Sequence, residues 1–316
     1  IRPSKSKKKL TMLSRVAERL YWFGRYLERV ENTARLLSVY SNVVLDLPKA
    51  GFVWGSLVDI TGYVESFNAR FKSPSERNVV KFLLDDPSSS LRANVLRARE
   101  NARTTRDLMP SEVWEKMNEL HFLLRGNLNQ RVNRNDRHEF LAQIIDLCLE
   151  LTGYLSGSMS RLPPYYFIKL GRNIERADMT TRVIDVACLN LMGPTSLLSE
   201  NDNILWMGVL QSLNGYQMYR QQIQARIQGT EVVDFLLKDQ SFPRSVNYCL
   251  GELSSSFKHL PRHDPAIKTV RRARRVIARV AAVDLLADEK LHEFIDQTQE
   301  NIGRTHESLT SIWFNG

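Results

Sequence analysis

The sequence lacks the features that mark membrane, loop-dominated and disulfide-rich proteins. No apolar run approaches the ~18 residues of a membrane-spanning helix, so we expect no membrane partner. Glycine (15) and proline (11) are sparse in 316 residues, which excludes a collagen-like or linker-rich chain. The three cysteines are far apart and surrounded by apolar residues, which fits reduced thiols in a cytoplasmic protein better than disulfides or a metal site. They are Cys148, Cys188 and Cys249.

Short motifs of nucleotide, metal and hydrolase chemistry are also missing. The chain has no Gly-x-Gly-x-x-Gly, no phosphate loop, no His-Glu-x-x-His, no Cys-x-x-Cys and no Gly-x-Ser-x-Gly. We therefore expect neither a bound cofactor nor a metal ion. The residues alone leave open whether the protein is an enzyme.

The net charge of +9 is unevenly distributed. A basic stretch without acids, residues 1–11, supplies five of these charges and leaves +4 for the rest. We interpret residues 1–11 as an extension that is disordered or foreign to the domain. A second basic run has no interleaved aromatic residues to stack on bases, so a solvated helix face is favoured over nucleic-acid contact. This run consists of Lys268, Arg271, Arg272, Arg274, Arg275 and Arg279.

What the sequence does have is helical periodicity from end to end. Near the start, apolar residues recur at alternating spacings of four and three, which places them in one stripe along a long helix. They are Val16, Leu20, Phe23, Leu27, Val30, Ala34 and Leu37. Similar patterns follow between proline- and glycine-containing breaks, and they predict helices over Trp54–Phe71 and Ile204–Ile227, among others. No segment alternates as a strand does, so the predicted fold class is all-α.

The chain also matches itself when it is shifted by about half its length. The pattern Gly-Arg-x-x-Glu-Arg, with three further similar positions, occupies both 24–35 and 171–182, an offset of 147. A second shared pattern occupies 79–86 and 232–239, an offset of 153. We therefore predict two tandem diverged repeats, 12–160 and 161–316, which pack together as one helical bundle with pseudo-twofold symmetry.

The repeated motif divides into two faces of its helix. One line of residues at spacings of four, three and four borders the apolar stripe, and the other arginines point further round. The glycine that opens the line costs ~1 kcal/mol inside a helix, which predicts close approach by another backbone or by a ligand. The lines are Gly24, Glu28, Glu31 and Arg35, and Gly171, Glu175, Asp178 and Arg182; the other arginines are Arg25, Arg29, Arg172 and Arg176.

Three interpretations of these charged residues compete. The first is an ion-pair network where the repeats meet, with Glu31–Arg35 and Asp178–Arg182 as i,i+4 pairs. The second is a site for a charged ligand, because arginines bind carboxylate or phosphate in bidentate fashion. The third is a carboxylate-bridged metal centre, which normally needs Glu-x-x-His motifs that are absent here. A further cluster with Arg99, Asn101 and Arg103 occurs only in the first half and is either part of a working site or a solvated face.

The sequence resembles the alpha-E family, bacterial all-helical proteins named for a shared Glu-Arg motif. The resemblance covers essentially everything after residue 11 and is closest at 12–29, 32–37, 98–103, 111–115 and 171–180. Such proteins are encoded beside, or fused to, circularly permuted ATP-grasp carboxylate–amine ligases. The resemblance therefore implies a setting of ATP-driven synthesis or modification of small peptides.

Our leading hypothesis is a helical partner of such a ligase, in trans or as a fusion. It would bind a carboxylate- or phosphate-bearing peptide, amino acid or intermediate through Arg25, Arg29, Arg99 and Arg103, oriented by Glu28 and Glu31. The first alternative is an enzyme for amide formation or transfer, with Glu28 or Glu175 as general base. This alternative requires a carboxylate whose pKa is raised by burial. The second alternative is a nucleic-acid-binding helical protein.

Overall fold

The computed structural model describes residues 13–46, 54–126, 128, 132–191, 202–224, 226–287 and 290–315. The predicted basic extension, residues 1–11, lies outside these ranges. The described residues form helices and connecting turns without any strand, which confirms the all-α prediction.

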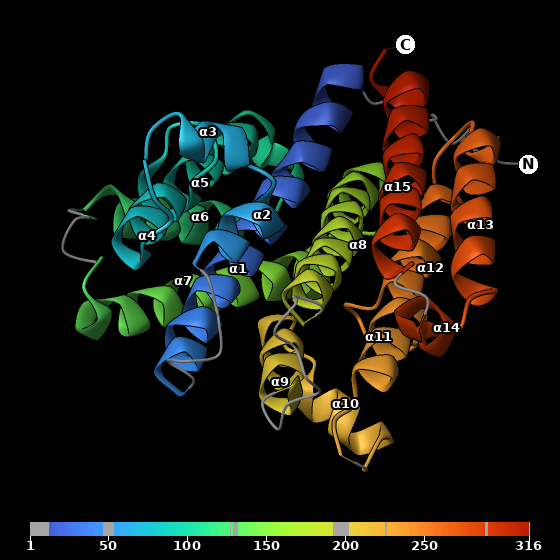
Figure 1. Ribbon diagram of the computed structural model, residues 1–316. Coiled ribbons are helices and arrows are strands. Elements are labelled where there is room, and N and C mark those ends of the chain that lie inside the picture. Colours follow the sequence, from blue (N-terminus) through green and yellow to red (C-terminus); the bar gives the residue numbers. More distant parts are fainter. Residues whose placement is uncertain are drawn as a thin grey trace, which may run out of the picture.

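The chain folds into a succession of long and short helices (Figure 1). The first half contains α1 (Ser14–Asp46), α2 (Gly55–Thr61), α3 (Val64–Asn68), α4 (Glu76–Asp85), α5 (Leu91–Thr105), the 3-10 turn η1 (Arg106–Leu108), α6 (Ser111–Arg125) and α7 (Arg134–Ser158). The second half contains α8 (Pro163–Leu191), α9 (Asp202–Ser212), α10 (Tyr216–Gln222), α11 (Gly229–Lys238), α12 (Val246–Phe257), α13 (Asp264–Ala278), α14 (Ala282–Ala287) and α15 (Leu291–Trp313).

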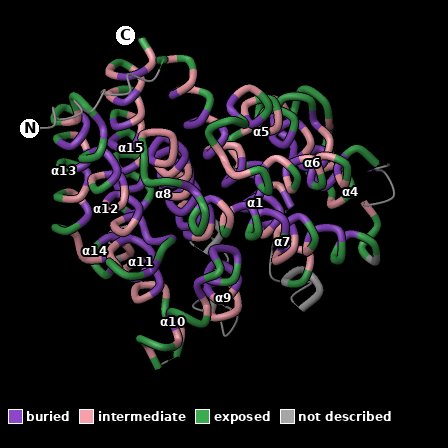
Figure 2. Tube along the Cα trace, turned by 180° about the vertical axis from the view of Figure 1, so that it is seen from behind, coloured by how far each residue is buried: buried purple, intermediate pink, exposed green. Residues whose placement is uncertain are grey.

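Helices α1 and α8 lie side by side in the middle of the molecule (Figure 1). Helices α5 and α7 pack on α1, whereas α12 and α15 pack on α8. Further contacts cross between the halves, since α2 also touches α8, and α9 and α15 also touch α1. Buried apolar side chains from both halves join in one continuous core, and Figure 2 shows buried positions following α1 and α8 along most of their length. The duplication and its repeat boundaries remain predictions.

Several helices begin where the sequence supplies a serine cap. The hydroxyls of Ser75, Ser90 and Ser245 accept hydrogen bonds from backbone N–H groups three residues further on, at the first turns of α4, α5 and α12. Such caps satisfy donors that a helix start leaves without partners. The loop before each of the last two caps also turns around an aspartate, because Asp86 and Asp239 accept backbone N–H bonds from residues two and three positions later.

The expectation of continuous helices over 54–71 and 204–227 was wrong. Helix α2 ends at Gly62, whose φ of 75° is left-handed, and α3 starts two residues later. In the second segment, Asn214 has a φ of 53° and separates α9 from α10. A left-handed residue ends a helix even when the apolar spacing continues through it. The break at Gly62 turns the chain next to α8, and the turn between α2 and α3 forms part of the candidate site described below.

At the two motif glycines, the backbones of α1 and α8 approach each other closely. A Cβ atom at Gly24 would lie closer than 3.0 Å to the Ile168 carbonyl oxygen, and one at Gly171 would lie equally close to that of Tyr21. Real Cβ atoms do not show such separations, and both obstacles are backbone atoms that cannot rotate away. Of the two reasons expected for these glycines, another backbone or a ligand, the structure shows close approach of another backbone.

Gly24→Ala and Gly171→Ala should therefore destabilise the protein, because α1 and α8 must move apart to admit a methyl group. We expect each change to lower the free energy of unfolding by about 1–3 kcal/mol or more in urea denaturation. The control is Gly153→Ala in α7, where nothing lies within 4 Å of the added Cβ. Since alanine favours helix more than glycine does, this control should be neutral or slightly stabilising. Equal effects at all three positions would contradict the close-approach argument.

Candidate functional site

Glu175 of α8 is held by two arginines of α1. Arg25 Nε donates to Glu175 Oε2 at 2.7 Å, and Arg29 donates to both carboxylate oxygens at 2.6 and 2.9 Å. The Glu175 side chain is 3% exposed, so its charge is almost entirely removed from water. A buried charge needs paired and hydrogen-bonded partners, and Arg29 supplies them in the bidentate geometry that guanidinium groups favour.

The same arrangement occurs with the roles of the helices exchanged. Arg176 of α8 donates to both oxygens of Glu28 on α1 at 2.8 Å, and Arg172 reaches Oε2 at 3.2 Å. Glu28 is completely buried. In each Glu-Arg dipeptide, the acid and the base therefore pair with the opposite helix rather than with each other.

The expected i,i+4 pairs are also formed. Arg35 Nε donates to Glu31 Oε1 at 3.0 Å, and Arg182 Nε donates to Asp178 Oδ2 at the same distance. The charged residues of the repeated helix thus form an ion-pair network across α1 and α8, as the first of the three interpretations expects. The other two interpretations concern what could bind to this network.

Sequence reasoning missed one member of the network, Arg244. This residue lies in the turn before α12, far from any motif, and its side chain is 7% exposed. It donates to Glu28 Oε1 at 3.0 Å, to Asn32 Oδ1 at 2.5 Å and to Glu31 Oε1 at 2.6 Å. Aligning the sequences of the two halves at Ser90 and Ser245 could have revealed it, because Arg244 then corresponds to the much smaller Ser89.

The arginines lower the pKa of both buried glutamates. Burial alone would raise the pKa of Glu28, but the charges of Arg176, Arg244 and Arg172 outweigh burial and hold this pKa well below its ordinary value. For Glu175 the same competition, with Arg25 and Arg29 as the cations, lowers the pKa to about 2. For Arg244 burial prevails over its two carboxylate partners, so its pKa is lowered.

A general-base role for Glu28 or Glu175 does not fit these environments. That alternative needs a carboxylate with a raised pKa, whereas both glutamates have lowered values and accept several charge-assisted hydrogen bonds. Glu28 accepts hydrogen bonds from three arginines and Glu175 from two. The geometry instead suits carboxylates that position cations.

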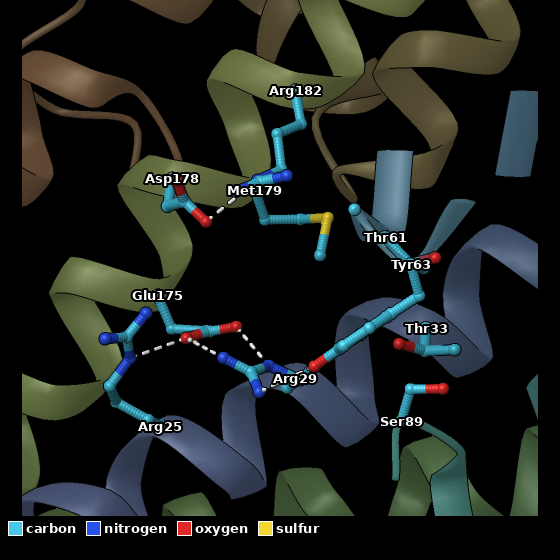
Figure 3. Close-up of a pocket in the computed structure, with 11 residues that line it drawn as sticks. Arg25, Arg29, Thr33, Thr61, Tyr63, Ser89, Glu175, Asp178, Met179 and Arg182 are labelled. Atoms are coloured by element: carbon cyan, nitrogen blue, oxygen red, sulfur yellow. Dashed lines mark hydrogen bonds and ion pairs between the residues drawn. The ribbon is translucent and has the colours of Figure 1, made fainter. Parts of the chain in front are cut away.

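A cavity opens on one side of the network (Figure 3). Its volume is about 210 Å³, and it lies where α1 and α8 meet the α2–α3 turn and the start of α5. Arg29 donates to the Tyr63 hydroxyl at 3.3 Å on one wall, while Arg182 lies against Gly62 on another. Figure 3 shows Glu175, Asp178 and Met179 along the α8 wall. The full lining is Arg25, Arg29, Thr33, Thr61, Gly62, Tyr63, Ser89, Glu175, Asp178, Met179 and Arg182.

Five of the thirteen predicted binding residues line this cavity: Arg25, Arg29, Glu175, Asp178 and Arg182. Arg172 and Arg176 instead border a smaller cavity of about 130 Å³ beside Tyr248 and Glu252. The cluster on α5 lines neither cavity. Arg99 donates to Asn118 and lies over the Trp114 ring, and Arg103 pairs with Glu100 at the surface. Asn101 accepts hydrogen bonds from neighbouring threonines through its backbone oxygen.

The remaining expectations concern metal, membrane and nucleic acid. Over the described ranges, no group of three or more histidine, cysteine, aspartate or glutamate side chains is placed to hold a metal ion. Within the same ranges, no helix is both long enough and apolar enough to cross a bilayer. The basic run lies on α13, whose apolar side is buried, and five of its six basic residues are exposed; the sixth, Arg274, donates to Asn247.

Comparison with known families agrees with this geometry. Residues 12–314 match the model of Alpha-E, described as a predicted alpha-helical domain with a conserved ER motif. The chain belongs to the Alpha-E family. The crossed pairs show what the Glu-Arg dipeptides do in this member: they join α1 to α8.

Two uncharacterized relatives, from Mycobacterium bovis and Mycobacterium tuberculosis, are each 24% identical to this chain over 278 residues. The match covers 78% of this chain but only 30% of each relative, so this Alpha-E chain corresponds to about a third of those proteins. No solved structure is detectably similar to it.

Removing one glutamate from the network should be strongly destabilising. Glu28→Gln leaves three buried arginines without their shared countercharge, and we expect a loss of about 3–5 kcal/mol in the free energy of unfolding. The control is Glu300→Gln, whose partner Arg304 is also at the surface; exposed pairs contribute little, so no measurable loss is expected. Similar stability of the two variants in urea denaturation would contradict a structural role for the crossed pairs.

Stability should also fall in acid because of these carboxylates. The folded-state pKa of Glu175, about 2, lies below the value of 4.5 expected in the unfolded chain. Its contribution is therefore fully present above pH 4.5 and is lost as the pH falls towards 2, because the unfolded state takes up the proton first. Urea denaturation between pH 6 and 3 should show that the free energy of unfolding falls less steeply with pH for Glu175→Gln than for the wild type. Parallel declines would show that Glu175 does not contribute.

Proposed function

We propose that this Alpha-E protein binds a small carboxylate- or phosphate-bearing ligand, an amino acid or short peptide, in the cavity between α1 and α8. The observation that carries the proposal is the lining itself: three arginines, a tyrosine hydroxyl and two carboxylates surround an open volume. Arginine is the side chain best suited to bidentate recognition of carboxylate and phosphate. At about 210 Å³, the cavity is smaller than the ~300–1,000 Å³ of sites for drug-sized molecules, so it suits a ligand of amino-acid size.

In this proposal Arg182 makes the main contact with the ligand. Arg25 and Arg29 are held on Glu175, whereas Arg182 has one partner carboxylate and its side chain is 33% exposed. It can therefore present donors to a ligand without breaking the buried pairs. The crossed pairs would keep the site in shape, so the network and the ligand-site interpretations are compatible.

We further propose that the chain is a duplicated unit acting as a partner of a circularly permuted ATP-grasp ligase, in trans or within a longer chain. The matching patterns at 24–35 and 171–182 support the duplication, and the exchanged roles of α1 and α8 in the pairs agree with it. The greater length of the mycobacterial relatives leaves room for a further domain beside an Alpha-E unit. Its role would be to hold a substrate or intermediate while the ligase uses ATP.

Ligand binding can be measured by calorimetry on the whole chain with glutarate, short acidic peptides and inorganic phosphate. Arg182→Gln should weaken binding of the active compound at least about tenfold, which corresponds to ~1.4 kcal/mol, the scale of one charge-assisted hydrogen bond. The matched control is Arg35→Gln, at the corresponding position of α1, which does not line the cavity. Its affinity should stay within about twofold of the wild type. Equal weakening by both variants would place the ligand elsewhere.

The partnership is tested separately by co-expressing the chain with the ATP-grasp ligase encoded nearest to it. We expect a complex that survives size-exclusion chromatography, or ATP turnover by the ligase that depends on the helical protein. If every neighbouring ligase fails in both measurements, the partnership is refuted. The ligand site is tested independently, by the calorimetry above.

A further inference from the structure

The most informative side chain for the ligand of the cavity is one that does not touch it, Arg244. Its guanidinium group is buried between α1 and α8, with hydrogen bonds to Glu28, Glu31 and Asn32. The pKa of Arg244 is lowered because burial outweighs the effect of those partners. Burying this cation therefore costs free energy, and the chain nevertheless places one here. This part of the network is therefore built around a cation supplied by the loop before α12.

The loop before α5 occupies the corresponding place and supplies no cation. Ser90 and Ser245 cap α5 and α12 in the same way, and each follows a turn organised by an aspartate. The residue just before the cap is Ser89 in the first loop and Arg244 in the second. Ser89 lines the cavity. A hydroxymethyl group thus stands where the other loop extends a full arginine side chain.

The carboxylates that would receive a cation are present at the cavity. Glu175 and Asp178 follow Glu28 and Glu31 at the offset of 147. Both face the cavity from α8 (Figure 3), as Glu28 and Glu31 face Arg244 from α1. Glu175 and Asp178 therefore occupy the same positions on α8 as Glu28 and Glu31 occupy on α1. They face an open volume, whereas Glu28 and Glu31 face a guanidinium group.

Glu175 has hydrogen-bonding capacity that Glu28 has already used. Glu28 accepts hydrogen bonds from three arginines, whereas Glu175 accepts from two, through three N–H groups. A carboxylate offers about four lone-pair positions, so Glu175 can accept one more donor. Asp178 accepts from Arg182 through Oδ2, so its second oxygen, Oδ1, can accept a further donor.

The charge balance also admits a cation. Around Arg244, four arginines including Arg244 itself surround two carboxylates, a surplus of two positive charges. Around the cavity, Arg25, Arg29 and Arg182 surround Glu175 and Asp178, a surplus of one. One bound monovalent cation would make the two surroundings equal. A ligand that also carries a carboxylate would leave the surplus unchanged.

One difference indicates how the cation is carried. The position of Asn32, whose amide oxygen accepts from Arg244, is taken by Met179 at the cavity. A thioether is a weak acceptor but packs well against methylene groups. The cavity therefore suits a cationic head on an alkyl chain, which the Met179 side chain can contact.

We propose that Glu175 and Asp178 bind the ammonium or guanidinium group of an alkyl-linked organic cation, such as the basic end of an amino acid or peptide, in the place that Arg244 fills on the other side of the network. This inference rests on the proposed function and adds to it: Arg182 recognises an acidic group, and Glu175 with Asp178 recognises the basic group of the same ligand.

Calorimetry on the whole chain with four probes tests this. Agmatine and cadaverine carry cations without a carboxylate, arginine carries both charges, and glutarate carries carboxylates only. We expect saturable binding of agmatine or cadaverine and tighter binding of arginine. Because agmatine carries one guanidinium and one ammonium group and cadaverine carries two ammonium groups, tighter binding of agmatine than of cadaverine indicates a guanidinium preference.

Two variants locate the cation. Ser89→Arg should place a guanidinium group in the cavity next to Glu175 and Asp178, as Arg244 places one next to Glu28 and Glu31. It should therefore abolish agmatine binding. The matched control Ser241→Arg adds the same charge at an exposed position in the corresponding loop and should leave binding unchanged. Asp178→Asn, which removes one charge without adding volume, should weaken agmatine binding at least tenfold.

Binding of glutarate without binding of agmatine, cadaverine or arginine overturns the cation site and leaves the proposed acidic-ligand function intact. Binding of none of these four probes overturns the cation site, and it overturns the proposed function as well if short acidic peptides and inorganic phosphate also fail to bind. Binding of agmatine that survives Ser89→Arg and Asp178→Asn unchanged shows that the cation binds elsewhere and also overturns the inference.

Discussion

The backbone contact between α1 and α8 is the constraint on which the rest of the structure depends. Gly24 and Gly171 each leave no room for a side chain beside the partner's carbonyl oxygen, so the backbones of the two helices are in direct contact there. This contact fixes how the helices are aligned along their axes. One turn further on, Glu28 and Glu175 consequently come within reach of arginines on the opposite helix.

The crossed ion pairs then select this alignment over others. Moving two carboxylates and four arginines out of water costs several kcal/mol per ion, and the loss is recovered only with good hydrogen-bond geometry. A shift of one helix by a single turn would leave buried charges without partners, whereas a shifted apolar interface would lose much less. The network thus acts against misaligned packing of two long helices whose apolar stripes alone would allow several registers.

The two sides of this network differ in the side chain that stands just before the serine cap. Arg244 completes the hydrogen bonds of Glu28 and Glu31, while on the other side the small Ser89 leaves a cavity next to Glu175 and Asp178. Duplicated scaffolds can keep one site filled by the chain itself and leave the other open to a ligand. If this applies here, the guanidinium group of Arg244 at Glu28 and Glu31 indicates the kind of chemical group that the cavity at Glu175 and Asp178 can bind.

The sequence by itself determined the all-helical fold, the long helix that starts each half, the i,i+4 pairs and the expectation that something approaches closely at Gly24 and Gly171. These depend on spacing within one helix, which 3.6 residues per turn makes readable. It misjudged the segments around Gly62 and Asn214, because the apolar spacing continues through a left-handed residue. Only the tertiary structure decided that Arg25 and Arg29 pair with Glu175, that Arg244 enters the interface, and that Arg99 and Arg103 stay outside the cavity. These contacts join residues that are 146 to 216 positions apart, and no local pattern specifies which of many arginines reaches a given carboxylate once the helices have packed.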